Sequence, residues 1–116
     1  MDALAKSIIE SKKIGRVKWY NLDLRYGFIT ILDNNTDIFV HKNNISSDLR
    51  YKCLFKGEYV ELDIINTDKG LQCNNIKGIN QGELLCESNP DLLKKIILGT
   101  YIEKNNPNLS YFKISS

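Results

Sequence analysis

Hydrophobic and polar positions alternate in short runs through the middle of the chain, as in half-buried β-strands. Five such runs, separated by turn residues, cover 15–21, 26–32, 37–41, 58–65 and 71–77. In the fourth run the aliphatic positions from Val60 to Ile64 share one parity, while Tyr59, Glu61 and Asp63 share the other, which predicts one buried and one wet face. The pattern predicts an all-β fold in which five short antiparallel strands form a small barrel.

On both sides of these runs, apolar residues recur with the spacing that is typical of a helix. Leu4 and Ile8 are four residues apart, as are Ala5 and Ile9, which predicts a short helix over 2–13. Residues 89–91 (NPD) are typical of a helix start, and the apolar stripe that follows predicts a helix over about 90–98. We therefore expect an N-terminal helical segment (1–13), a barrel domain (14–80) and a C-terminal extension with one helix (81–116).

Aromatic residues gather on the second and third predicted strands. Tyr26 and Phe28 alternate with aliphatic positions on one strand, and Phe39 and His41 do so on the next. If the aliphatic set faces the core, the four flat rings stand together on the solvent side. Stacking of unpaired bases is a physical reason for such exposure, worth roughly 1–3 kcal/mol per base. The alternative is ordinary core or cross-strand packing of the rings.

Trp19 on the first predicted strand would extend this set of rings. Simple alternation places it on the same side as the aliphatic Val17. A bulge near Lys18 is therefore required if Trp19 is to face outward.

Composition limits the remaining classes of function. The 116 residues suffice for one domain, and 16 Lys and Arg against 14 Asp and Glu leave a net charge of +2. A nucleic-acid partner must therefore be held by a local patch. We expect a cytoplasmic protein, with the nucleus as a further location and no membrane contact, because no apolar run approaches the ~18 residues of a span.

The scarcity of chemically reactive residues argues against an enzyme or a metalloprotein. The three cysteines contain no C-x-x-C pair, so we expect free thiols and no zinc site. His41 is the single histidine, which excludes two-histidine metal centres. No cofactor is expected.

Several motifs make residues 14–80 resemble the cold-shock domain. Residues 15–21 (GRVKWYN) are similar to the family's G-x-V-K-W-F-N opening, 26–29 (YGFI) to its G-F/Y-G-F-I motif and 37–41 (DIFVH) to its D-V-F-V-H motif. Residues 56–62 (KGEYVEL) are similar to E-G-E-x-V-E-F, and 69–78 to the K-G-x-x-A-x-N-V-T-G ending. The long loop 42–57 and Tyr26 resemble the eukaryotic Y-box version more than the bacterial one.

The resemblance implies an oligonucleotide-binding (OB-fold) barrel that binds single-stranded RNA or DNA. The implied base-stacking residues are Trp19, Tyr26, Phe28, Phe39 and His41. Lys18 would make a polar or phosphate contact, and the family's placement of Trp19 on the binding face implies the bulge. The other basic residues near this face are Arg16, Arg25 and Lys42.

The chain departs from the family at two positions in this region. Leu24-Arg25 stands where the family has K-G, so a glycine is lost that tolerates unusual backbone angles, and Arg25 could compensate with a phosphate or stacking contact. Lys42 places a charge where bacterial members have Phe.

Three functions therefore remain open from the sequence. The first is single-strand binding, as a nucleic-acid chaperone or a regulator of transcription or translation. The second is a protein-interaction scaffold, or a homodimer formed through the N- or C-terminal segment. The third and weakest is a nuclease that uses His41 with Glu61 or Asp63.

Overall fold

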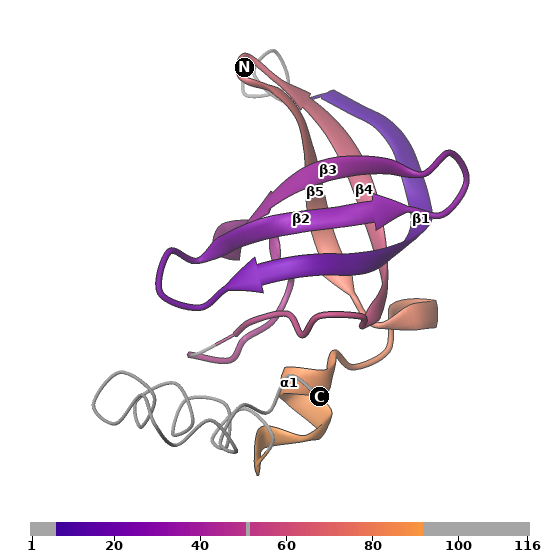
Figure 1. Cartoon of the computed structure of the whole chain (residues 1–116). Coiled ribbons are helices and arrows are strands. Elements are labelled where there is room, and N and C mark those ends of the chain that lie inside the picture. The colour runs from indigo at the N-terminus through magenta and orange to yellow at the C-terminus, as the bar shows by residue number, and fades with distance from the viewer. Residues whose placement is uncertain (1–6, 51, 92–116) are drawn as a thin grey trace.

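Five β-strands make up most of the computed structural model, which describes residues 7–50 and 52–91. The strands are β1 (Ser7–Asn21), β2 (Tyr26–Ile31), β3 (Thr36–His41), β4 (Tyr59–Thr67) and β5 (Gly70–Lys77). They close into a barrel in the order β1-β2-β3-β5-β4 (Figure 1). The predicted five-stranded barrel is thus confirmed.

One strand pair departs from the antiparallel arrangement expected from the sequence. β3 pairs with β5 in parallel, at Phe39 and Gln72. This direction is forced, because β2 is antiparallel to both β1 and β3, and β4 is antiparallel to both β1 and β5. β3 and β5 therefore both run with β1, and a barrel that closes between them must close in parallel.

The interior of the barrel is aliphatic, as the alternation predicted. Along β2 every second residue is buried, from Gly27 through Ile29 to Ile31. The largest fully buried side chains of the five strands are Val17, Ile29, Ile31, Val40, Val60, Leu62, Ile65, Cys73 and Ile76. Side chains of the opposite parity on β2 and β3 consequently point away from the core.

The predicted N-terminal helix is wrong for residues 7–13, which form the first half of β1. This half-strand pairs with β4, with Ile8 opposite Ile65 and Lys13 opposite Leu62. A helix of ~12 residues is marginal in water, so backbone pairing with an existing strand outweighs the weak helical spacing. Residues 2–6 of the predicted helix lie outside the described residues.

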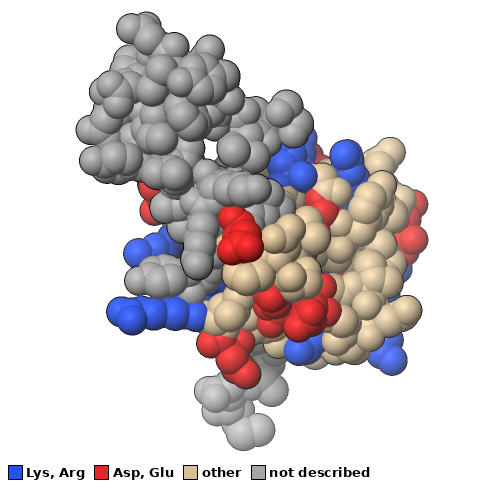
Figure 2. Space-filling view, turned by 90° about the horizontal axis from the view of Figure 1, so that it is seen from below, with Lys and Arg blue, Asp and Glu red and all other residues tan. Residues whose placement is uncertain are grey.

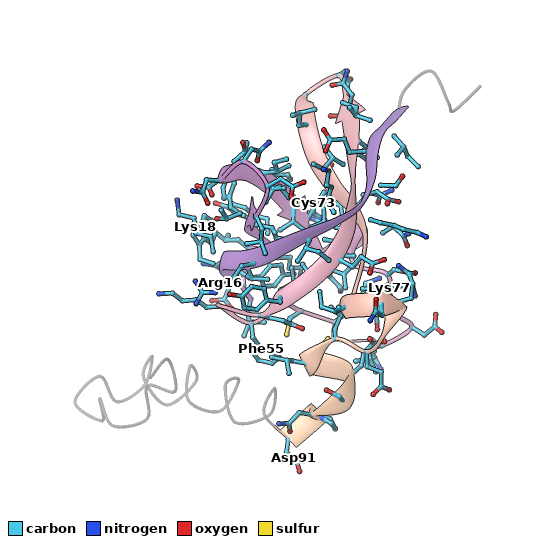
Figure 3. The ribbon with its side chains drawn as sticks, turned by 90° about the vertical axis from the view of Figure 1, so that its right-hand side faces the viewer. Arg16, Lys18, Phe55, Cys73, Lys77 and Asp91 are labelled. Atoms are coloured by element: carbon cyan, nitrogen blue, oxygen red, sulfur yellow. The ribbon has the colours of Figure 1, made fainter. Side chains whose placement is uncertain are left out.

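The lower end of the barrel, which we call the base, is closed by segments that follow β3 and β5. They include the short helices η2 (Lys42–Asn44), η3 (Ile79–Gln81) and α1 (Leu85–Ser88), and Phe55 lies between the barrel and α1 (Figure 3). Leu84 and Cys86 are fully buried within the barrel's own hydrophobic cluster. The beginning of the predicted C-terminal extension is therefore part of the core.

The predicted C-terminal helix is described only at its start. Pro90 and Asp91 are helical, as expected, and the rest of the predicted stretch lies outside the described residues. The sequence analysis did not foresee α1, a single turn whose short length leaves no periodic pattern to read.

Two buried carboxylates tie the base together, and one of them overturns an expectation. Glu61, predicted on the wet face of β4, is only 7% exposed because its carboxylate accepts hydrogen bonds from the Asn80 N–H and the Gln81 side-chain amide. Glu58, also 7% exposed, accepts from the N–H groups of Phe55 and Leu85. Figure 2 views this end of the molecule, where Asp and Glu side chains gather near the middle of the face.

The three cysteines are free, as the sequence predicted, and all three are buried. Burial raises the pKa of the Cys73 thiol to about 12. A hydrogen bond between Cys53 and Cys86, together with burial, raises the pKa of the Cys53 thiol. The same hydrogen bond lowers the pKa of Cys86 against the opposing effect of burial. Within the described residues no helix is both long and apolar enough to cross a membrane.

Candidate nucleic-acid interface

Four aromatic rings form a continuous cluster, the ring face, on the outer side of β1, β2 and β3. Phe28 lies directly opposite Phe39 across β2 and β3, and its ring centroid is 5.9 Å from that of Phe39 and 5.4 Å from that of Trp19. The Tyr26 ring lies 5.5 Å from Trp19 and 5.7 Å from Phe39. The sequence predicted these four positions, and the structure brings all four together.

A bulge in β1 turns Trp19 outward, as the sequence required. Val17 pairs with Ile29 and Trp19 with Phe28, so Lys18 is the extra residue on β1. Because of this one-residue shift, Val17 points into the core while Trp19 joins the ring face. β2 crosses β1 so closely here that an added Cβ at Gly27 would lie 2.1 Å from the Trp19 carbonyl oxygen, which explains the glycine.

The four rings of the ring face are partly exposed, and they face away from the core. Trp19 is 37% exposed, and the Tyr26, Phe28 and Phe39 side chains are of intermediate burial. Tyr20 is also of intermediate burial, but it packs against the hydrophobic core, and burial raises the pKa of its phenol to about 12. The ring face therefore leaves flat apolar surface accessible from outside the barrel.

His41 extends the ring face at the end of β3. It lies opposite Tyr26, and its half-buried ring is held by a hydrogen bond in which Nδ1 accepts from the Asn43 N–H. Because Nδ1 accepts, the neutral imidazole carries its proton on Nε2. His41 thus offers a flat ring surface and an N–H donor.

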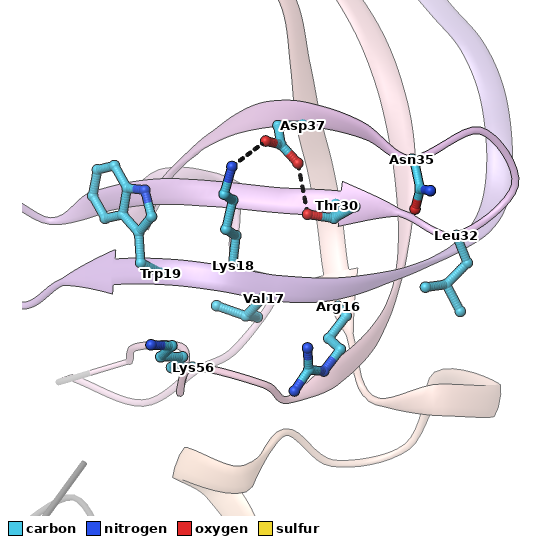
Figure 4. Close-up of a pocket in the computed structure, with 9 residues that line it drawn as sticks. All are labelled: Arg16, Val17, Lys18, Trp19, Thr30, Leu32, Asn35, Asp37 and Lys56. Carbon is cyan, nitrogen blue, oxygen red and sulfur yellow. Dashed lines mark hydrogen bonds and ion pairs between the residues drawn. The ribbon is translucent and has the colours of Figure 1, made fainter. Parts of the chain in front are cut away.

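Lys18, a predicted polar or phosphate contact, is held in an ion pair beside Trp19. Its Nζ lies 2.6 Å from Oδ2 of Asp37, whose Oδ1 accepts a hydrogen bond from the Thr30 hydroxyl (Figure 4). The hydrogen bonds from Lys18 and Thr30 lower the pKa of the Asp37 carboxyl, so Asp37 stays ionised. The sequence analysis did not anticipate this network.

Comparison with known proteins identifies the architecture of this site. A model of the 'Cold-shock' DNA-binding domain matches residues 13–79. The chain belongs to this family. Family membership implies nucleic-acid binding as the class of function, and the family is not one of enzymes.

Relatives of this cold-shock domain come from bacteria and animals. A cold shock-like protein of Aquifex aeolicus is 40% identical over 67 residues, which are 58% of this chain and 94% of that protein. Cold shock protein 1 of Lactiplantibacillus plantarum is 45% identical over 64 residues, or 55% and 94%. Y-box-binding protein 1 of Xenopus laevis is 38% identical over 76 residues, or 63% of this chain but only 25% of that protein.

The two predicted departures from the family pattern, Arg25 before β2 and Lys42 after β3, are joined by a backbone hydrogen bond. Arg25 adopts a left-handed conformation (φ 64°), the region that a glycine would reach without strain. Its N–H donates to the Asn21 carbonyl and its carbonyl accepts from the Lys42 N–H, at 2.7 and 2.9 Å. Arg25 and Lys42 therefore flank the end of the ring face next to Tyr26 and His41.

Arg16, the remaining predicted contact, lies apart from the ring face. Its guanidinium carbon is 5.9 Å from the centre of the Tyr59 ring. Together with Lys18, Trp19 and Lys56 it lines a groove on the outer side of the barrel (Figure 4). Sequence reasoning missed Lys56 and Tyr59, although Lys56 stands at the first glutamate of the E-G-E-x-V-E-F segment, which was the available signal.

Proposed function

We propose that this cold-shock domain binds single-stranded RNA or DNA by stacking unpaired bases on the ring face. The observation that supports the proposal is the outward, half-exposed cluster of Trp19, Tyr26, Phe28 and Phe39 with ring centroids 5.4 to 5.9 Å apart. Rings on a solvent face lose hydrophobic free energy unless they are covered by a partner. A base has a flat π-face that covers a ring well, whichever base it is.

Preference for single strands follows from access to base faces. In a duplex each base is stacked between its neighbours, so its face is unavailable to a protein ring. Unpaired strands are in equilibrium with duplexes and hairpins. When the protein binds the unpaired form, the equilibrium shifts toward it, and secondary structure melts by mass action. The proposed role is therefore that of a nucleic-acid chaperone or regulator of transcription or translation, acting in the cytoplasm or nucleus.

Affinity in this proposal depends more on stacking than on charge. Residues 14–80 carry nine Lys and Arg and eight Asp and Glu, so the barrel is almost neutral. If two to four basic side chains contact phosphates, log K falls with log salt with a slope of roughly −1.5 to −3. Stacking does not read the 2′-hydroxyl, so we expect both RNA and DNA to bind.

The other two functions receive less support. A scaffold or homodimer was expected through the terminal segments 1–13 and 81–116. Residues 7–13 belong to β1, and residues 1–6 and 92–116 lie outside the described residues. In the nuclease alternative Glu61 or Asp63 would act with His41. Both oxygens of the Glu61 carboxylate accept hydrogen bonds from η3, and those of Asp63 accept from the Lys12 N–H and the Asn75 side-chain amide.

Ring truncation tests the proposal. We expect Phe28→Ala and Phe39→Ala each to weaken the binding of a labelled single strand of about eight nucleotides by roughly 5–150-fold, equivalent to ~1–3 kcal/mol. Fluorescence anisotropy measures the affinity and circular dichroism verifies the fold. Leu85→Ala is the matched control, because Leu85 is an apolar side chain at the base that is 39% exposed. Unchanged affinity in both folded ring variants contradicts the proposal.

A further inference from the structure

A groove of about 640 Å³ begins where the ring face ends, at Trp19 (Figure 4). It runs along the outer side of β1 and β2 toward Leu32 and Asn35. Trp19 belongs to both surfaces, so a strand stacked on the ring face can continue into the groove without leaving the protein. The groove is therefore placed to receive the next part of the same ligand.

Two unpaired cations give this groove its charge. It is lined by Arg16, Lys18 and Lys56 and by a single carboxylate, Asp37. Asp37 is engaged by Lys18, and its other oxygen accepts from Thr30. No ion pair of Arg16 or Lys56 occurs among residues 7–50 and 52–91. These two side chains therefore carry the groove's excess positive charge.

Arg16 is held in place before any ligand arrives. Its guanidinium lies over the ring of Tyr59, a residue that is 54% exposed at the start of β4. On another side it approaches Gly57 so closely that an added Cβ there would lie 3.2 Å from a guanidinium nitrogen. A side chain with many rotamers loses less entropy on binding when its position is already restricted.

We propose that this groove is a phosphate-binding extension of the ring face, in which Arg16 and Lys56 contact the backbone of the nucleotide that follows the one stacked on Trp19. Tyr59 is a positioning residue that fixes the Arg16 guanidinium. This inference rests on the proposed single-strand binding and lengthens its site beyond the ring face. A nucleic-acid backbone is favoured over an acidic peptide because the groove is continuous with surface that suits bases.

Neutralisation of Lys56 tests the extension through the salt dependence of binding. For Lys56→Gln we expect the slope of log K against log salt to become less steep by about 0.7 on single-stranded DNA of about eight nucleotides, since one phosphate contact is lost. The wild type then loses roughly 2–3-fold more affinity than the variant when salt rises fourfold. On strands of about four nucleotides, which the ring face accommodates alone, the two proteins should have equal slopes.

Lys69→Gln is the matched control, because Lys69 is an exposed lysine in the turn between β4 and β5 and the charge change is identical. Its slope should equal that of the wild type on both lengths. An equal change of slope in Lys56→Gln and Lys69→Gln would overturn the extension and indicate a general charge effect.

The role of Tyr59 is tested by a conservative pair of variants. Tyr59→Phe retains the ring beneath Arg16 and should preserve the wild-type slope. Tyr59→Leu removes the ring and should reduce the slope on the longer strand as Arg16→Gln does. If Tyr59→Leu behaves like the wild type while Arg16→Gln does not, the positioning role is wrong.

The remaining outcomes separate this inference from the proposed function. If the wild type binds single strands and both Lys56→Gln and Arg16→Gln keep its slope, the extension is wrong and ring-face binding stands. If the wild type binds no single strand, both are wrong. A third outcome is that a polyglutamate peptide binds the wild type but not Lys56→Gln, while the oligonucleotide slopes of the two proteins are the same. The occupant of the groove would then be an acidic peptide instead.

Discussion

The ring face and the base of the barrel both violate the usual rules of burial, in opposite senses. At the base the carboxylates of Glu58 and Glu61 are buried, and each receives two hydrogen bonds from neighbouring segments. On the ring face, aromatic surface is left accessible, and the rings contact mainly one another. The exception at the base is explained by contacts within the chain, whereas the exception on the ring face is explained by the proposed binding of unpaired bases.

This difference predicts that variants in the two regions have opposite consequences. Ring truncations should reduce binding, and they should reduce stability only through the ring-to-ring contacts that are lost. Truncation of a base carboxylate should reduce stability and leave the affinity of the folded protein unchanged.

The largest expected effect on stability is at Glu58. Glu58→Ala removes the acceptor of the Phe55 and Leu85 N–H groups, which lie 3.1 and 2.7 Å from its two oxygens. An unpaired buried donor costs ~1–3 kcal/mol, and relief of the buried carboxyl offsets part of the loss, so we expect a net decrease of about 1–3 kcal/mol in the free energy of unfolding. Urea unfolding measures it, with Asp68→Ala in the exposed turn between β4 and β5 as control.

A weakened single-strand affinity of the folded Glu58→Ala protein, comparable to that of a ring variant, would contradict this division of roles between the two regions. The base would then contribute to the binding site. Equal stabilities of Glu58→Ala and Asp68→Ala would show that the two hydrogen bonds at Glu58 do not hold the base.

A smaller effect is expected in the pH dependence of stability. Burial raises the pKa of the Glu58 carboxyl above its ordinary value of 4.5, against the opposing hydrogen bonds from Leu85 and Phe55. The folded state therefore holds this proton more tightly than the unfolded state, so the contribution of Glu58 is complete below about pH 4.5 and is lost as the pH rises through the raised pKa.

The direction of this pH dependence of stability can be measured by comparison with Glu58→Gln, whose side-chain amide does not titrate. The difference in unfolding free energy between the wild type and Glu58→Gln should decrease from pH 4 toward neutrality in urea titrations. A difference that increases over this range would mean that hydrogen bonding outweighs burial at Glu58.

The smallest predicted change is a gain in stability at Arg25, where the sequence departs from the family pattern. Arg25 occupies the left-handed region with φ 64°, which costs a non-glycine residue about 1–2 kcal/mol. Arg25→Gly relieves this strain but adds entropy to the unfolded chain, so we expect a net gain of about 0.5–1 kcal/mol in urea unfolding. Arg25→Lys keeps both charge and strain and is the control.

The same Arg25 variants test whether Arg25 belongs to the nucleic-acid interface. If Arg25 contacts a phosphate, Arg25→Gly should lower the salt slope by about 0.7 while Arg25→Lys preserves it. Identical slopes in all three proteins would remove Arg25 from the interface.

Sequence reasoning succeeded where the signal was local. The period-two alternation of β2 and β3 placed Tyr26 and Phe28 outside and Ile29 inside, and the resemblance to the cold-shock domain implied the bulge that the structure contains at Lys18. These features depend on strand geometry, which a short stretch of sequence determines.

It failed where contacts distant in sequence decide the outcome. Residues 7–13 pair with β4, 49 to 59 positions away in the sequence, so their helical spacing was misleading. Glu61 is buried because Asn80 and Gln81 fold over it, and Arg16 meets Tyr59 only when β1 and β4 pair. The parity of a strand does not indicate which of its polar positions a later segment will cover.

Trp19 fluorescence reports directly on whether bases stack on the ring face, because this residue is the single tryptophan and is 37% exposed within the cluster. Titration with single-stranded RNA or DNA should quench the emission to saturation, and the same DNA as a duplex should leave it nearly unchanged at equal nucleotide concentration. Emission unaffected by single strands, or quenched equally by the duplex, would contradict the account.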